Sequence, residues 1–125
     1  MTVTEYMKKT YSRNEYNVRE RAACVDGFEV SIQGGTAGHY CIPREHCNEY
    51  EAVELGYPNR VEESLIEYAE SPETPLDSVY GFVPIEVVER IVEKHGGIDY
   101  EKSLMQNMSE ELKKHKWLLK EDCEV

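Results

Sequence analysis

The sequence has no long apolar run. None of its apolar stretches approaches the roughly 20 residues that span a bilayer, so no membrane segment is expected. The first residues include lysines but lack the apolar core of a secretory signal. With 125 residues, 40% of them hydrophobic and 31% charged, the chain has the composition of a soluble globular domain. These features predict one cytoplasmic domain over residues 1–125.

Basic residues are also scarce, and the shortage is uneven. The chain has 14 Lys and Arg against 25 Asp and Glu, a net charge of −11. Residues 1–48 are balanced, whereas within 49–77 nine acids oppose Arg60 alone. Such a field repels nucleic acid and anionic membranes and attracts basic surfaces. We therefore expect no direct nucleic-acid or membrane binding through the acidic part, although acidity that only keeps the protein soluble remains an alternative.

Several chemical signatures are missing as well. The four cysteines, Cys24, Cys41, Cys47 and Cys123, have no CxxC spacing and are expected to be free thiols. The run GGTAG at residues 34–38 is followed by neither a helix nor a lysine, and GxGxxG is absent. A phosphate-binding loop requires these features. The run is therefore interpreted as a glycine-rich connection between strands.

The middle of the chain shows the alternation typical of strands. The Asp26-Gly27 pair between two β-prone runs predicts a hairpin with a type I′ turn. After it, Phe28, Val30 and Ile32 are expected to face the core, with Glu29, Ser31 and Gln33 on the solvent side. The run HYCI at 39–42 predicts a returning strand that ends at Pro43.

A further strand, a helix and a strand–helix pair follow. Residues 51–57 predict a strand with Val53, Leu55 and Tyr57 inward, and residues 60–70 a helix. Residues 79–83 predict a buried strand, which leads from Pro84 into a helix that ends at the Gly96-Gly97 pair.

The two ends of the chain give weaker patterns. Residues 1–20 are poorly assigned, with a short helix near 4–11 capped by Thr4, and residues 107–125 predict a C-terminal helix, capped by Ser109, and a tail. Taken together, the elements predict an α+β domain. It has an antiparallel sheet of about four strands, with two or three helices packed on one face.

Metal binding and nucleophilic catalysis have candidate residues but poor spacing. The candidate ligands are Cys24, His39, Cys41, His46 and Cys47. They lack the paired spacing of a structural zinc site, so a metal-stabilised structural protein is only an alternative. Activation of Cys41 or Cys47 by a neighbouring histidine is disfavoured because adjacent strand residues point to opposite faces. We therefore predict a protein that is not an enzyme, with no catalytic residue, bound metal or cofactor.

A second alternative is a small-ligand module, for example for a nucleotide signal. It would place a pocket under the loop of residues 34–44. The residues that would bind the ligand are Gln33, Gly34, Gly35, His39 and Arg44.

The acids of residues 49–77 are a more specific signal of function than these motifs, because residues 1–48 carry equal numbers of acidic and basic residues. If the outer faces of the strand and the helix adjoin, the carboxylates form one acidic surface that resembles a phosphate backbone. Tyr50, Tyr57 and Tyr68 are candidate aromatic anchors, since binding hot spots favour tyrosine. The predicted partner-binding residues are Glu49, Glu51, Glu54, Tyr57, Glu62, Glu63, Glu67, Tyr68 and Glu70.

The pattern DGFxxSxQ, then HYCxPR, then YGxVPxxVVxxxxxxHGGI resembles a family of small uncharacterised phage- and prophage-encoded proteins. The resemblance covers roughly residues 24–98. It implies a mobile-element protein in the cytoplasm of a bacterial host. Small acidic phage proteins are often inhibitors of host defence, anti-CRISPR proteins among them. By that analogy the expected partner is a basic, nucleic-acid-handling host protein, such as a CRISPR effector.

Overall fold

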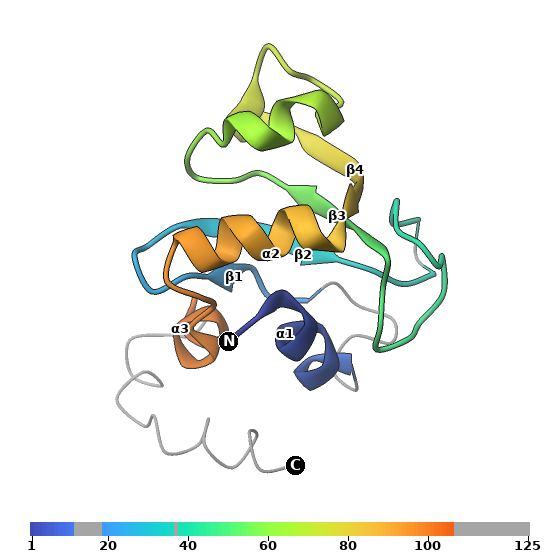
Figure 1. Cartoon of the computed structure of the whole chain (residues 1–125), viewed down its shortest axis with the longest axis vertical. Coiled ribbons are helices and arrows are strands. Elements are labelled where there is room, and N and C mark those ends of the chain that lie inside the picture. The colour runs from blue at the N-terminus through green and yellow to red at the C-terminus, as the bar shows by residue number, and fades with distance from the viewer. Residues whose placement is uncertain (12–18, 37, 107–125) are drawn as a thin grey trace.

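A computed structural model describes residues 1–11, 19–36 and 38–106. Four antiparallel strands, β1 (Ala22–Ala23), β2 (Glu29–Gln33), β3 (Ala52–Gly56) and β4 (Val79–Pro84), form one sheet in the order β1-β2-β3-β4 (Figure 1). The helices are α1 (Val3–Lys9), α2 (Ile85–Lys94) and α3 (Tyr100–Met105), and there are two 3₁₀ segments, η2 (Glu63–Tyr68) and η3 (Pro75–Asp77). The predicted small α+β domain is confirmed. The predicted C-terminal helix from Ser109, the tail and Cys123 lie outside the described residues.

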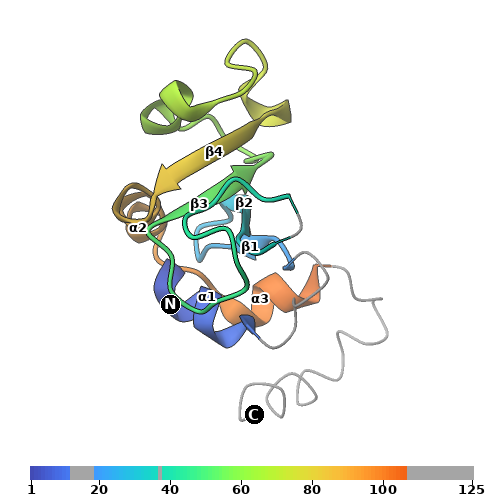
Figure 2. The ribbon, with the colours of Figure 1, turned by 90° about the vertical axis from the view of Figure 1, so that its right-hand side faces the viewer.

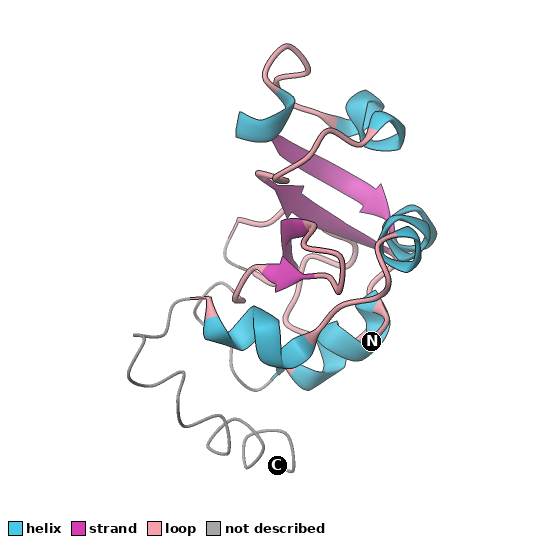
Figure 3. Ribbon diagram, turned by 90° about the vertical axis from the view of Figure 1, so that its left-hand side faces the viewer, coloured by secondary structure: helices cyan, strands magenta, loops and turns pink. Residues whose placement is uncertain are grey.

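Helix α2 lies across the sheet, α1 packs against α2, and α3 packs against β1 (Figures 1 and 3). Ser103 of α3 accepts a hydrogen bond from the backbone N–H of Ala23 (2.8 Å), which fixes α3 to the short edge strand. At the opposite edge, η2 packs on β4, and the chain of residues 61–78 forms a separate lobe beyond that strand (Figure 2). We call residues 61–78 the acidic lobe.

The core follows the predicted periodicities. Phe28, Val30 and Ile32 are buried on one side of β2, as expected from the alternation. Helix α2 buries the stripe of Val88, Ile91, Val92 and His95, also as predicted. It ends where Gly96 and Gly97 both adopt a positive φ (+89° and +88°), a conformation that glycine adopts without steric cost.

The hairpin between β1 and β2 is present, but its turn is not type I′. The N–H of Gly27 donates to the carbonyl of Cys24 (3.0 Å), and the N–H of Cys24 donates to Phe28 (2.8 Å). Gly27 has φ +98°, whereas Asp26 is not among the described residues with positive φ. This is a type I turn followed by a left-handed glycine, as in three-residue hairpin loops. Asp26 instead uses its carboxylate to accept the N–H of Phe28 (2.9 Å).

The predicted strand at 39–42 is wrong. Within this segment only Ile42 forms a bridge, an isolated one to Ala52. On the side of β2 away from β1, the paired strand is β3, with a register from Ser31↔Gly56 to Gln33↔Glu54. The backbone of this segment is used differently. The carbonyl of Tyr40 accepts the N–H of Phe82 in β4 (2.9 Å).

Several side chains lie opposite to their predicted side, among them Phe82, which is 44% exposed in a strand predicted to be buried. Tyr57 is 49% exposed with φ +52°, because the chain turns at the end of β3, and Gln33 is buried against the backbone of Arg19. The helix expected over 60–70 is a 3₁₀ segment that begins only at Glu63, so Glu62 has an extended backbone and is buried.

The N-terminal cap of helix α1 is Thr2, two residues before the predicted cap Thr4. Thr2 accepts the N–H of Glu5 (3.1 Å), and Glu5 accepts the N–H of Thr2 (2.8 Å), which is a complete capping box. Thr4 lies inside the helix, where its hydroxyl donates to Glu89 of α2 (3.1 Å).

Candidate protein-interaction surface

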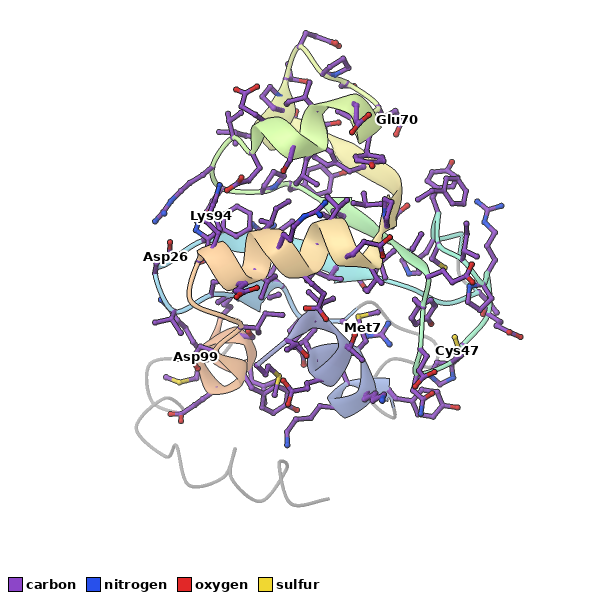
Figure 4. All side chains as sticks on the ribbon, in the orientation of Figure 1. Met7, Asp26, Cys47, Glu70, Lys94 and Asp99 are labelled. Carbon is purple, nitrogen blue, oxygen red and sulfur yellow. The ribbon has the colours of Figure 1, made fainter. Side chains whose placement is uncertain are left out.

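The acidic lobe concentrates the exposed negative charge. Residues 61–89 contain eight Asp and Glu and no Lys, Arg or His. Within the lobe, the exposed acids are Glu63, Glu67, Glu70, Glu73 and Asp77. Figure 4 shows Glu70 on the lobe, close to β4. This part of the predicted partner-binding set therefore does lie on one projecting segment.

The other predicted acids are placed elsewhere. Glu49 is exposed and pairs with Lys8 of α1 (3.4 Å), and Glu51 is exposed just before β3. Glu54 is used within the protein, since it contacts Nδ1 of His39 (3.0 Å) and accepts the N–H of Tyr40 (3.2 Å). The acids before residue 60 thus do not extend the lobe.

Glu62 is part of a buried ionic cluster. Its Oε1 lies 2.6 Å from Nε2 of His95, and its Oε2 accepts a hydrogen bond from Nζ of Lys94 (2.6 Å). The other ring nitrogen of His95, Nδ1, lies 2.6 Å from Oδ2 of Asp26, and the ring stacks on Phe28 with centroids 4.2 Å apart. Figure 4 shows Asp26 and Lys94 at the same corner of the molecule. We call these four residues, Asp26, Glu62, Lys94 and His95, the His95 cluster.

The His95 cluster shifts the titration of both carboxyl groups. The hydrogen bond from His95 holds the pKa of Asp26 below its ordinary value, with the N–H of Phe28 adding to the effect. Burial acts to raise the pKa of Glu62, but hydrogen bonds from Lys94 and His95 together outweigh it and leave that pKa lowered. The cluster therefore has a structural role, and Glu62 is not available to a partner.

An exposed group of aromatic side chains adjoins the lobe. The rings of Tyr40 and Phe82 lie 5.7 Å apart, and both side chains are more than two-fifths exposed. The guanidinium of Arg44 lies 5.1 Å and 5.4 Å from their centroids. Beside them is an open, shallow depression of about 310 Å³. We call it the aromatic depression; its lining residues are Tyr40, Tyr68, Glu70, Val79, Gly81 and Phe82.

A β-bulge turns Phe82 outward. The pairing shifts between Val53↔Val83 and Leu55↔Tyr80, so Gly81 and Phe82 together oppose Glu54. Phe82 has φ +52°, a conformation that is sterically unfavourable for a bulky residue. A Cβ at Gly81 would lie only 3.3 Å from Cβ of Tyr40, so glycine permits the close approach of the loop. Sequence reasoning missed Tyr40 and Phe82; a glycine inside a strand was the available signal for a bulge.

The predicted ligand loop has its polar groups engaged. Gln33 is buried, and its side-chain amide pairs with the backbone N–H and C=O of Arg19 (2.8 and 3.0 Å). Gly34 lies under the ring of Tyr50, which is buried and donates its hydroxyl to Glu45 (2.9 Å). Tyr50 is therefore a packing residue and not the exposed anchor that was predicted.

The remaining ligand-loop residues also have partners within the chain. The N–H of Gly35 donates to Sγ of Cys41 (3.4 Å), and Arg44 donates to the carbonyl of His39 (3.3 Å). His39 itself contacts Glu54. The structure thus brings the predicted ligand-binding residues close together, but their polar groups bond to other groups of the protein.

Among the thiol and histidine candidates, Cys24 and Cys41 are buried. Burial raises the pKa of Cys24 to about 11, with Asp26 adding to the effect, and burial also raises the pKa of Cys41. His46 stacks on Tyr11, with Nε2 2.8 Å from its carbonyl oxygen. In the part of the chain that the structure describes, no three or more His, Cys, Asp or Glu side chains are arranged to hold a metal ion.

Within residues 1–11, 19–36 and 38–106, no helix is long and apolar enough to cross a membrane. No family model, curated protein or solved structure matches the chain.

Proposed function

We propose that the protein is a non-enzymatic inhibitor that binds a basic, nucleic-acid-handling protein through the acidic lobe. One observation carries the proposal: the lobe projects beyond the edge strand β4 with five exposed acids, in a stretch of 29 residues (61–89) that contains no basic residue. The aromatic depression lies directly against it. Charge for long-range attraction and aromatic area for short-range contact are therefore adjacent.

The proposed mechanism is competition for a nucleic-acid site. Carboxylates spaced along η2 and the following loop occupy positions that phosphates would take on a partner's lysines and arginines. Charge complementarity speeds encounter over about 8–10 Å and falls with salt, and buried aromatic contacts supply most of the affinity. The resemblance to phage proteins supports a setting in the bacterial cytoplasm. The analogy with small acidic phage inhibitors supports a host defence protein, such as a CRISPR effector, as the target.

No specific observation favours the small-ligand alternative, because its donors on Gln33, Gly35 and Arg44 already bond within the chain.

The test is capture of a partner from a bacterial lysate by the full tagged chain at several salt concentrations. The variant Glu63→Gln/Glu67→Gln removes two exposed lobe charges. The matched control, Glu86→Gln/Glu93→Gln, removes two exposed charges from α2. We expect a stoichiometric basic partner that is retained less as salt rises, is largely lost with the lobe variant and is kept by the control.

The purified partner then provides the second readout. Nucleic acid and the inhibitor should compete for it, with the wild type displacing a labelled oligonucleotide and the lobe variant failing to do so. Capture that is indifferent to salt, or equal loss with both double variants, would contradict docking through the lobe.

A further inference from the structure

The aromatic depression has the chemistry of a site for one cationic side chain. Its lining includes three aromatic residues, Tyr40 of the loop before β3, Tyr68 of η2 and Phe82 of β4, and one acidic residue, Glu70. Aromatic faces attract cations through the ring quadrupole, and a carboxylate adds direct Coulomb attraction. We propose that the depression binds an arginine side chain of the protein partner. This inference rests on the proposed function and names the contact that would anchor it.

The size of the depression fits a single side chain. About 310 Å³ is at the small end of the roughly 300–1,000 Å³ typical of pockets for small molecules. The depression is open to solvent, so a free small molecule would stay largely exposed in it. A side chain on a protein surface would be covered by the rest of that protein. An arginine on a protein surface is covered in this way.

The molecule itself shows that these rings accept a guanidinium. Arg44 places its guanidinium 5.1 Å from the Tyr40 centroid and 5.4 Å from the Phe82 centroid, and it is not part of the lining of the depression. A planar, weakly hydrated guanidinium stacks on aromatic rings better than an ammonium does. The partner's residue is therefore arginine in preference to lysine.

Charge complementarity selects a basic occupant over an apolar one. Glu70 lies at the depression, and Glu67 and Glu73 are exposed near it in the chain. An acidic or neutral peptide gains nothing from this field, whereas a cation is attracted from beyond contact distance.

The test uses the full ¹⁵N-labelled chain and two peptide probes, N-acetyl-Gly-Arg-Gly-amide and the same peptide with neutral citrulline in place of arginine. We expect the arginine peptide to shift the amide signals of residues 68–70 and 79–82 at low salt. The citrulline peptide should bind at least about tenfold more weakly, because it keeps the shape and loses the charge. Equal shifts from both peptides, or shifts spread over the acidic residues without those of 79–82, would overturn the proposal.

Two pairs of variants separate the site from the general field. Tyr40→Leu and Glu70→Gln should each weaken the arginine peptide about threefold or more. The matched controls, Tyr57→Leu and Glu93→Gln, remove an exposed tyrosine and an exposed acid outside both the depression and the acidic lobe and should leave its affinity within about twofold. The amide spectrum of each variant reports its fold. Equal weakening by Glu93→Gln and Glu70→Gln would assign binding to the field and not to the depression.

The two proposals can fail separately. Salt-dependent capture of a partner without arginine shifts at 79–82 would overturn only the arginine site. Arginine shifts at the depression without any salt-dependent partner would overturn the inhibitor function and leave the site.

Discussion

Nε2 of His95 lies 2.6 Å from Oε1 of Glu62, although the two residues are 33 positions apart. The contact joins the C-terminal end of α2 to the first turn of the acidic lobe. Through Nδ1, which faces Asp26, the same ring also holds the β1–β2 turn. One imidazole thus connects three segments that are distant in sequence. These contacts hold the start of the acidic lobe against the end of α2.

Removal of Glu62 should destabilise the fold. Glu62→Ala deletes both acceptors of the His95 and Lys94 donors and leaves a buried ring nitrogen without a partner, so we expect the free energy of unfolding to fall by about 2–3 kcal/mol. The neighbouring substitution Glu63→Ala, on an exposed side chain, should cost less than about 0.5 kcal/mol. Urea denaturation of both variants measures the difference. A small, equal effect at both positions would show that the cluster contributes nothing.

The His95 cluster should also give the protein an acid-sensitive stability. The pKa values of Asp26 and Glu62 are both lowered in the folded state, from ordinary values of 3.8 and 4.5. Groups with lowered pKa stabilise the fold above their ordinary values, and this contribution is lost as pH falls through the lower, folded pKa. Thermal unfolding between pH 6 and 3 should therefore show a decline that begins near about pH 4.5.

The double variant Asp26→Asn/Glu62→Gln checks the assignment. It should be less stable than the wild type at pH 6, with a shallower decline below about pH 4.5, because neither side chain titrates. An unchanged slope would attribute the acid sensitivity to other carboxyl groups.

Local periodicity explains what the sequence predicted well. Phe28, Val30 and Ile32 alternate with polar residues, and Val88, Ile91 and Val92 repeat at helical spacing, so each element identifies its own buried face. The hairpin at Asp26-Gly27 is likewise a local property. The four strands followed from such signals, whereas the pairing of β2 with β3, in place of the strand predicted at 39–42, did not.

The misplaced residues depend on contacts between distant segments. Glu62 has the spacing of an outer helical face, yet it is buried because His95 and Lys94 lie above it in the fold. Tyr40 and Phe82 meet only because a bulge in β4 sets Phe82 opposite Glu54 together with Gly81. No pattern within one segment carries that information. The sequence therefore predicted the charge of the candidate site, through Glu63, Glu67 and Glu70, and one of its aromatic residues, Tyr68. It did not predict Tyr40 and Phe82.

Gly34 should prove to be a packing glycine. A Cβ at this position would lie 2.7 Å from the Tyr50 ring, which is buried and held by its hydroxyl hydrogen bond to Glu45. Gly34→Ala should therefore lower the free energy of unfolding by about 1–3 kcal/mol.

Gly56→Ala is the matched control for that substitution. A Cβ at Gly56 meets Ser31 at 3.7 Å, an ordinary contact, and alanine suits a strand better than glycine. It should be neutral or slightly stabilising in the same denaturation experiment. A tolerated Gly34→Ala would show that the Tyr50 ring can move.

Phe82 offers a way to separate folding from binding. Its φ of +52° costs about 1–2 kcal/mol for a residue with a Cβ, and its side chain is 44% exposed. Phe82→Gly relieves that strain but adds about 0.5–1 kcal/mol of unfolded-state entropy, so the free energy of unfolding should change little. Phe82→Val, which is β-branched, should instead lose about 1–2 kcal/mol. Thermal and urea unfolding compare the two.

Both substitutions remove the aromatic ring, so both should weaken partner capture and arginine-peptide binding. Only Phe82→Gly should weaken binding while keeping the stability of the wild type, because this substitution removes the backbone strain together with the ring. The amide spectrum and the binding titration on the same sample make the comparison. If Phe82→Gly lowered the free energy of unfolding by more than about 2 kcal/mol, the ring would be part of the packing. The bulge would then serve the fold and not an exposed binding surface.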